Sequence, residues 1–205
     1  MKRILASIAG TALVLASAAA MAAPGIIVPH ASVPRPNQDR GAFVNQIGDD
    51  QNATINSENA AQLARIAQSG SGNTASVTQS GSGHHYADVA QAGDDNFAHV
   101  TAAGGGDQVA LLSQTGSGNE MLVSQRGELS NGVLASQNGV GNQLDLLQDG
   151  GNNQAQLAQN GDGNAMTASQ TGTGANLIWT QNGNNNANLN VVQGSGQALI
   201  ITQSH

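Results

Sequence analysis

The residues of this chain best suited to chemistry are glutamines that recur at a nearly constant spacing. Gln occupies every eleventh position in the central part of the chain, at Gln137, Gln148, Gln159, Gln170 and Gln181. A primary amide both donates and accepts hydrogen bonds, so identical amides that stack above one another can bond into a continuous row. A fixed period has to be identified before any other pattern, because it determines the architecture. The spacing predicts a repeat protein whose amides form ladders.

The period extends over most of the chain. Fifteen positions end successive units, and thirteen of them are Gln, whereas Ser57 and Ala102 take the other two places. Most intervals between these positions match that of the central part, and the others are one position longer or shorter. Gly follows two residues later in twelve of fourteen units, and in the central units Asn commonly follows three residues after the Gly. A disordered polar tract has no reason to keep such a register, so ordered structure is expected despite 27 Gly, 2% aromatic and 9% charged residues.

Two sets of residues carry the expected structural site. In three units the Asn place is expected to be held by Asp107, His85 and Ala175. The amide-ladder positions are Gln46, Gln68, Asn73, Gln79, Gln91, Asn96, Gln114, Asn119, Gln125, Asn131, Gln137, Asn142, Gln148, Asn153, Gln159, Asn164, Gln170, Gln181, Gln193 and Gln203. The turn glycines are Gly48, Gly70, Gly81, Gly93, Gly104, Gly116, Gly127, Gly139, Gly150, Gly161, Gly172 and Gly183.

The elements that position these residues are strands. From Asn73 to Gln79, Asn, Ala, Val and Gln alternate with Thr, Ser and Thr, which is the period of a strand with one buried face. A helix is disfavoured because a Gly in every unit costs it about 1 kcal/mol each time. Strands of about seven residues joined by turns of about four predict an all-β, cross-β solenoid. It has two strands per 22-residue coil and about seven coils, with small aliphatic side chains between two facing sheets. Trp179 faces inward, where small neighbours above and below are expected.

Three segments are predicted along the chain. Residues 1–22 have the basic start, apolar run and Ala-Met-Ala end of a secretory signal peptide. Residues 23–39 hold all four prolines and form an extended leader, and residues 40–205 form the repeat solenoid. Removing Lys2 and Arg3 from the six basic residues leaves four against 13 acidic ones. A basic face for nucleic acid is therefore missing, and the chain is expected to be exported.

Other candidate sites are weak. His84 and His85 near Asp88 suggest a metal site, but His85 faces the core of a strand and Asp88 the opposite side. The Gly-x-Ser-x-Gly motif of a hydrolase is missing from the sequence. Gly104-Gly-Gly-Asp107 resembles a calcium-binding repeat, but it occurs once and such a site needs tandem copies. We expect no catalytic residue, no metal site, no cofactor and no small-molecule substrate.

The repeat resembles a known family. Gln68-Ser-Gly70-Ser-Gly-Asn73-Thr-Ala75-Ser-Val-Thr-Gln79 is similar to the curlin repeat, and the similarity covers about residues 40–203. Curlins are the secreted subunits of curli, the functional amyloid fibres of bacterial biofilm matrix. The resemblance implies export through an outer-membrane pore with accessory factors, polymerisation at the cell surface with a companion curlin subunit, and control of assembly by the ladder residues.

The predicted function is assembly of an extracellular fibre for adhesion and biofilm matrix. Both outermost strands are expected to lack a cap, so copies would stack edge to edge. A major subunit is favoured over a minor nucleator subunit because the central units are regular and carry few charges. A soluble β-solenoid adhesin or binding module is the alternative from another class, and an enzyme is not expected.

Overall fold

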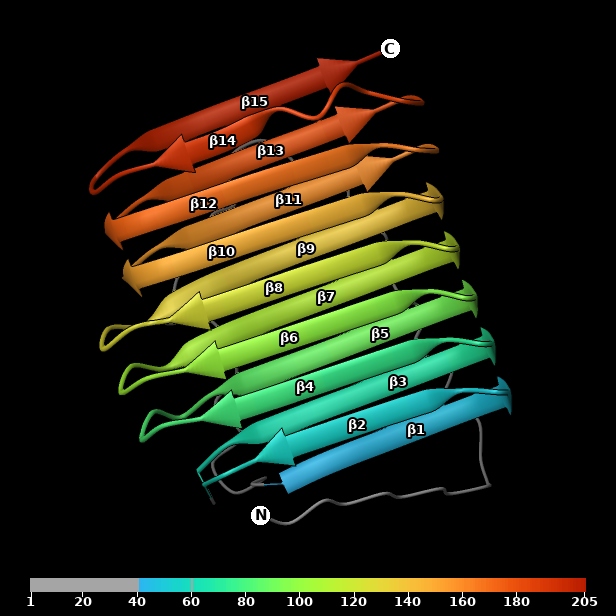
Figure 1. Ribbon diagram of the computed structural model, residues 1–205, viewed down its shortest axis with the longest axis horizontal. Helices are drawn as coiled ribbons and strands as arrows, with labels where there is room; N and C mark the ends of the chain where they lie inside the picture. The colour runs from blue at the N-terminus through green and yellow to red at the C-terminus, as the bar shows by residue number, and fades with distance from the viewer. Residues whose placement is uncertain (1–40, 60) are drawn as a thin grey trace.

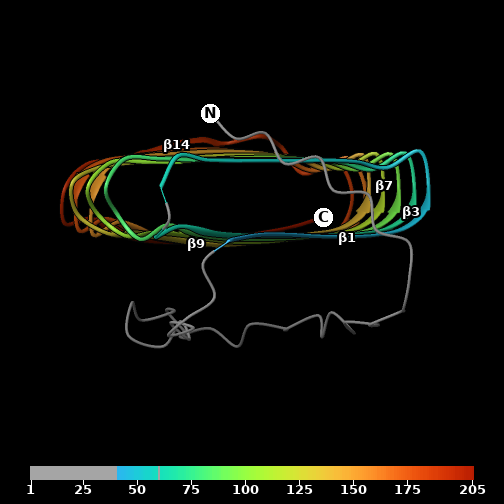
Figure 2. The same ribbon diagram turned by 90° about the horizontal axis from the view of Figure 1, so that it is seen from below.

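The protein is a flattened parallel β-solenoid (Figures 1 and 2). The computed structural model describes residues 41–59 and 61–205. The expected signal peptide and Pro-rich leader, and Arg40, lie outside the described residues. Strands of one sheet are β1 (Gly41–Asp49), β3 (Leu63–Ser71), β5 (Tyr86–Asp94), β7 (Gln108–Ser117), β9 (Asn131–Val140), β11 (Gln154–Asn160), β13 (Asn176–Asn182) and β15 (Ala198–Ser204). Strands of the other are β2 (Asn52–Ser57), β4 (Thr74–Ser80), β6 (Phe97–Ala103), β8 (Glu120–Arg126), β10 (Gln143–Gly151), β12 (Ala165–Thr173) and β14 (Asn190–Gln193).

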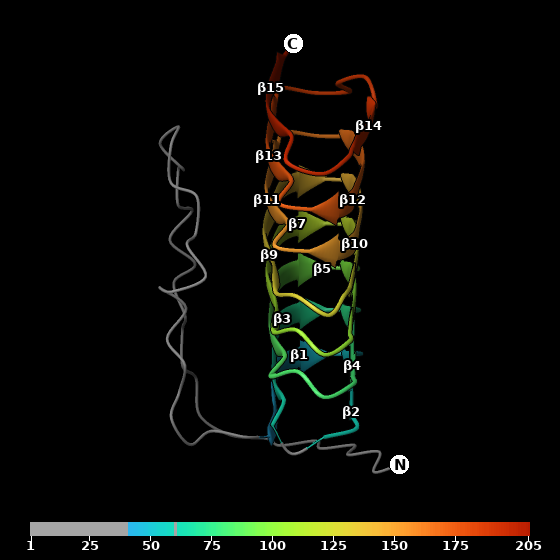
Figure 3. The same ribbon diagram turned by 90° about the vertical axis from the view of Figure 1, so that its left-hand side faces the viewer.

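The chain alternates between the two sheets, so strands two apart in sequence are neighbours in space. Figure 3 shows the sheets as two facing layers. All pairings are parallel, and each residue pairs with its equivalent one coil further along, as Gly41 does with Leu63 and Leu63 with Tyr86. The predicted all-β solenoid with two strands per coil and about seven coils is confirmed. Most longer coils arise where a turn takes up one more residue, whereas in the unit that ends at Gln193 the extra residue follows Asn186.

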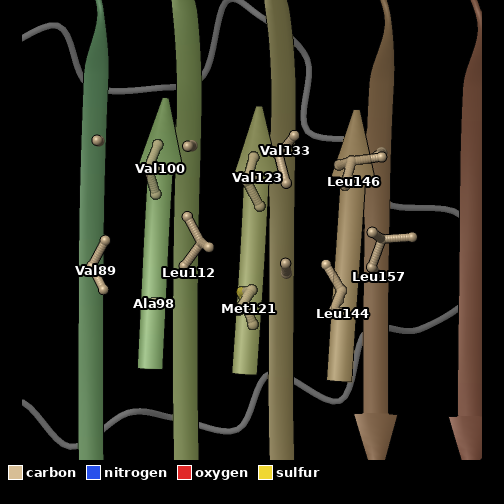
Figure 4. Close-up of a cluster of buried hydrophobic side chains, with 14 of the residues drawn as sticks. Val89, Ala98, Val100, Leu112, Met121, Val123, Val133, Leu144, Leu146 and Leu157 are labelled. Carbon is tan, nitrogen blue, oxygen red and sulfur yellow. The ribbon is translucent and has the colours of Figure 1, made fainter. Parts of the chain in front are cut away.

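Alternation along each strand creates a thin apolar interior. In β4, Ala75, Val77 and Gln79 are buried, while the residues between them are half-buried on the outer face. Figure 4 shows Val100, Val123 and Leu146 projecting from neighbouring strands into this interior. Small and β-branched side chains suit a pleated surface between closely facing sheets. The core is therefore a stack of similar layers, and no single central cluster dominates it.

Trp179 is an exception to the small side chains of the core. It is fully buried, as its alternation predicts. The expectation of small neighbours above and below is wrong, because its row neighbours are Leu157 and Ile201. Its indole Nε1 donates a hydrogen bond of 2.9 Å to Oε1 of Gln203. This bond gives the buried N–H a partner, as a buried indole requires.

A column of glycines allows the coils to approach closely at the corners. The twelve expected turn glycines all have positive φ, such as +114° at Gly116. A Cβ atom built on Gly116 would lie 2.0 Å from the carbonyl oxygen of Gly139 in the next coil. Only a residue without Cβ fits this combination of dihedral angle and contact. The glycines are therefore required by the repeat of the coil itself.

Candidate functional site

One row of glutamines runs without interruption through the eight-stranded sheet. Each member before the last donates Nε2 to Oε1 of the glutamine one coil further along, over distances of 2.7–2.9 Å. The row is Gln46, Gln68, Gln91, Gln114, Gln137, Gln159, Gln181 and Gln203. The six inner members are buried, whereas Gln46 and Gln203 at the two ends are half-buried. The row thus joins the first and last strands of the solenoid through one chain of hydrogen bonds.

The buried glutamines of both rows also tie the two sheets together, which the sequence did not indicate. Nε2 of Gln137 in β9 donates to the backbone oxygen of Glu120 in β8 at 2.9 Å. Nε2 of Gln148 in β10 likewise donates to the oxygen of Gly132 in β9 at 3.2 Å. The two amide hydrogens therefore serve different purposes, one along the stack and one across it. The second bond of each amide therefore ends on a backbone oxygen of the facing sheet.

The second row of glutamines, in the seven-stranded sheet, has a gap. Gln125, Gln148, Gln170 and Gln193 are joined by bonds of 2.7–3.0 Å. Ala102 stands between Gln79 and Gln125 in the register. Oε1 of Gln79 and Oε1 of Gln125 are buried and have no hydrogen-bond partner among the described residues. The departures at Ser57 and Ala102 therefore leave two buried amide oxygens unpaired.

Filling the gap should stabilise the protein. We expect Ala102→Gln to give Oε1 of Gln125 a donor and Nε2 of Gln79 an acceptor, as in the complete row. The gain should be about 1–3 kcal/mol, the usual penalty of a buried unpaired polar group. The midpoint of guanidinium unfolding measures it. Ala103→Gln, on the outer face of the same strand, is the control, and an equal shift in both variants would contradict the assignment.

Asparagines form shorter rows at the start of the strands. Asn73, Asn96, Asn119, Asn142 and Asn164 are buried, and each Oδ1 accepts bonds from the backbone N–H and the Nδ2 of the Asn one coil further along. The second Nδ2 hydrogen reaches a turn glycine, as from Asn96 to the oxygen of Gly116 at 2.9 Å. Each asparagine therefore bonds both to the next asparagine of its row and to a glycine of the turn column.

The second asparagine row contains residues that sequence analysis assigned wrongly or missed. The Asn place expected for Asp107 is held by Gln108, because the extra residue of this longer unit lies in the turn after Gly104. Gln108 is buried, and its Oε1 accepts a 2.8 Å bond from Nδ2 of Asn131. Gln62, in this second row, is also buried and was missed. Asn186 was missed as well; it is buried in the first row, where its Nδ2 donates to Oδ1 of Asn164. Counting back six residues from each unit-ending Gln finds Gln62 and Gln108. Asn186 lies seven back, since its unit has the extra residue after the Asn.

His85 replaces an asparagine within this row. It is buried, its Nδ1 lies 3.3 Å from the backbone N of Gln108, and its Nε2 lies 2.7 Å from the oxygen of Ser80. The Gln108 N–H donates to Nδ1, so the proton of the neutral ring is on Nε2, which donates to Ser80. Burial lowers the pKa of His85, and the backbone bond to Ser80 and the charge of Asp107 oppose this only partly. The ring is therefore held neutral, as a substitute for an amide.

The buried His85 should make the stability of the protein depend on pH. Because the pKa of His85 is lower in the folded chain than its ordinary value of 6.5, the unfolded chain binds the proton more strongly. The contribution of neutral His85 to the free energy of unfolding is fully present above pH 6.5 and is lost as the pH falls through the lowered pKa of the folded chain. We expect His85→Asn to lose less stability than the unmodified chain between pH 7.5 and pH 5 in guanidinium unfolding. Equal losses would show that other groups carry the dependence.

The remaining candidates do not converge. Asp88 accepts a bond from the Tyr86 hydroxyl at 3.1 Å and lies 3.6 Å from Arg65. His84 lies 3.3 Å from Asp107 on the exposed side. His85 thus faces away from Asp88, and no group of three or more His, Cys, Asp or Glu that could hold a metal occurs in residues 41–59 and 61–205. The described part of the chain also contains no helix long and apolar enough to cross a membrane.

Comparison with known proteins identifies the repeat. A family model described as the curlin associated repeat matches residues 63–86, which cover β3, β4 and the start of β5. No curated protein and no solved structure matches the chain. The matched segment is one coil, and the other coils stack on it in the same register. One coil of this chain is therefore similar to the curlin associated repeat.

Proposed function

We propose that this chain is a structural subunit of an extracellular amyloid fibre of the curli type. The curlin repeat and the solenoid fold support a curli-like structural subunit. The observation that carries fibre assembly is the state of the outermost strands. Within residues 41–59 and 61–205, β1, β2, β14 and β15 each pair on one side only. Their other edges present backbone groups that a second copy of the chain can pair.

The side chains at both ends favour the same conclusion. Ile200 and Val192 on the last strands are 70% and 68% exposed, and Phe43 on the first strand is 51% exposed. Gln46 and Gln203 are half-buried ends of the ladder. A further coil stacked on either end would cover part of these outer-face side chains, as the coils around Ile178 do in the inner strand β13, and would bury the two glutamines. The ladder that orders the coils inside one copy would then also order the copies along a fibre.

The remaining parts of the proposal follow from the curlin resemblance. Residues 1–22 would direct export and residues 23–39 would form a leader ahead of the solenoid. The chain would cross the outer membrane through a dedicated pore with accessory factors and would polymerise at the cell surface with a companion curlin subunit. The regular central coils favour a major subunit over a minor nucleator, and the chain has no enzymatic role in this proposal.

Fibre growth in vitro tests the proposal. Purified mature chain is held at neutral pH while amyloid-dye fluorescence and sedimentation are followed with and without preformed seeds. We expect a lag that seeds abolish and a sedimenting product with a cross-β reflection at about 4.8 Å. A chain that stays monomeric for days with seeds would instead favour a soluble binding module. A bacterial strain lacking the chain should lose its fibres if this is the major subunit, and mislocalise them if it is the nucleator.

The exposed rung of the ladder should control the rate of growth. We expect Gln203→Ala to slow seeded elongation severalfold, because a new coil would meet no amide in that row, and buried Gln68→Ala to act in the same direction. Thr202→Ala, on the outer face of β15, is the matched control for the terminal rung. Thr74→Ala is the outer-face control for the internal one. The slope of dye fluorescence at fixed seed concentration gives the rate, and comparable slowing by inner and outer changes would refute the assignment.

A further inference from the structure

The two ends of the solenoid have the same stepped shape. β1 and β15 both belong to the eight-stranded sheet. At each end this sheet therefore projects half a coil beyond the other, so that β15 lies beyond β14 and β1 lies before β2 (Figures 1 and 3). When two copies meet end to end without rotation, the projecting β15 of one copy meets the projecting β1 of the next.

The step decides how many strands can pair across a junction. Without rotation, β15 pairs with β1 of the next copy at about 4.8 Å, and β14 is left roughly 9.6 Å from β2 of that copy. That interval is the width of one missing strand, and both edges beside it keep unpaired backbone groups. With a half-turn, each projecting strand enters the recess of the other copy. Then β14 pairs with β1, β15 pairs with β2, and both sheets continue.

We propose that successive copies in the fibre are related by a two-fold screw, each making a half-turn about the solenoid axis relative to the one before. This inference rests on the proposed function, since it describes the junction of that fibre. The half-turn is compatible with the repeat because successive strands of one copy, which alternate between the two facing sheets, are already related in this way. Both sheets are built from the same repeat unit, with Gln at the same place. The rise per copy would be seven and a half coils, or roughly 36 Å.

The side chains agree with this register. Aligning Gln193 with Gln46 of the next copy places Val191 over Val44, both of which face the core. Aligning Gln203 with Ser57 of the next copy likewise places Ile201 over Ile55. Gln193 would donate to Gln46 in the direction in which Gln170 donates to Gln193 within one copy. The apolar interior and one glutamine row would therefore run through the junction without a break.

Disulfide trapping distinguishes the two junctions, because the chain has no Cys of its own. Under the screw, Val192 lies beside Asn45 of the next copy, and without rotation Ile200 lies beside Phe43. All four side chains are exposed on outer faces. Neighbouring parallel strands place such residues about 4.8 Å apart, within the range that a disulfide spans. In a single copy the paired positions lie on opposite ends of the solenoid, so any disulfide formed must link two copies.

Two double variants, Asn45→Cys with Val192→Cys and Phe43→Cys with Ile200→Cys, are assembled under reducing conditions and then oxidised mildly. We expect the first pair to give a ladder of covalent multimers on a non-reducing gel after the fibres are dissolved, and the second pair to give monomers. Multimers from the second pair alone, or fibres that give multimers from neither pair, would overturn the screw.

Helical symmetry of the unmodified fibre, measured by cryo-electron microscopy, gives an independent answer if a cysteine variant does not assemble. The screw predicts a half-turn per copy with a rise of roughly 36 Å, against a rotation near zero with roughly 38 Å for the unrotated junction. Fibres with the second symmetry overturn this inference and leave the proposed function intact. A chain that forms no fibres overturns the proposed function, and the screw with it.

Discussion

Gly116→Ala is expected to destabilise the solenoid by about 4 kcal/mol, which is among the largest effects of a single substitution. The φ of Gly116 is +114°, a value that residues with Cβ rarely adopt. The added Cβ would lie 2.0 Å from the oxygen of Gly139 and 2.9 Å from its carbonyl carbon. Because these are backbone atoms of the next coil, the contact can be relieved only by separating the coils. The free energy of guanidinium unfolding measures the loss.

Gly118→Ala is the matched control for this prediction. Gly118 lies in the same turn and also has positive φ, at +62°, but a Cβ there meets no atom within 4 Å. It should lose only about 1 kcal/mol, the ordinary penalty of the left-handed conformation. If the two alanine variants were equally destabilised, dihedral strain alone would explain the glycine column, and close approach of the coils would have no part in it.

Gln137→Ala is expected to destabilise the protein by about 3–5 kcal/mol, the sum of lost hydrogen bonds and a new cavity. Gln137 accepts from Nε2 of Gln114 at 2.8 Å, donates to Oε1 of Gln159 at 2.8 Å and donates to the oxygen of Glu120 at 2.9 Å. Its removal leaves buried groups above it and opposite it unpaired, each at roughly 1–3 kcal/mol. Unfolding in guanidinium, followed by circular dichroism, gives the value.

Two further variants separate the causes. Gln137→Leu keeps most of the volume but none of the hydrogen bonds, so it should lose nearly as much stability as Gln137→Ala. Ser136→Ala, on the outer face of the same strand, should change stability by less than about 0.5 kcal/mol. A stable Gln137→Leu variant would mean that the row contributes packing, and that its hydrogen bonds are dispensable.

The sequence was sufficient to predict the architecture because the same information is repeated in every unit. Alternation in segments such as Asn73–Gln79 identified strands and their buried faces, and the Gln spacing identified the coil. The additional residue of a longer unit lies in the turn between Gly127 and Asn131, so the strand that follows keeps its phase. A repeat averages out local exceptions, so single departures such as Ser57 and Ala102 did not obscure the fold.

What could not be predicted depends on contacts between different units. The bond from Gln137 to the oxygen of Glu120 crosses between the sheets, and no spacing in the sequence reports which backbone oxygen faces which amide. The unpaired oxygens beside Ala102 become visible only when the register brings Gln79 and Gln125 to either side of it. Gln108 was missed because counting forward from Gly104 entered a turn of variable length, whereas the strand on its far side keeps a fixed length.

The opposite senses of the two kinds of ladder affect the electrostatics of a long fibre. Glutamine Nε2 of one coil donates to the coil after it, as from Gln91 to Gln114, whereas asparagine Nδ2 donates to the coil before it, as from Asn119 to Asn96. The two sets of amide dipoles therefore point in opposite directions along the axis and largely cancel. Unlike an α-helix, whose aligned peptides give partial charges at its ends, the stacked side chains add little macroscopic dipole as coils accumulate. A filament of any length consequently offers an incoming copy nearly the same field at its tip.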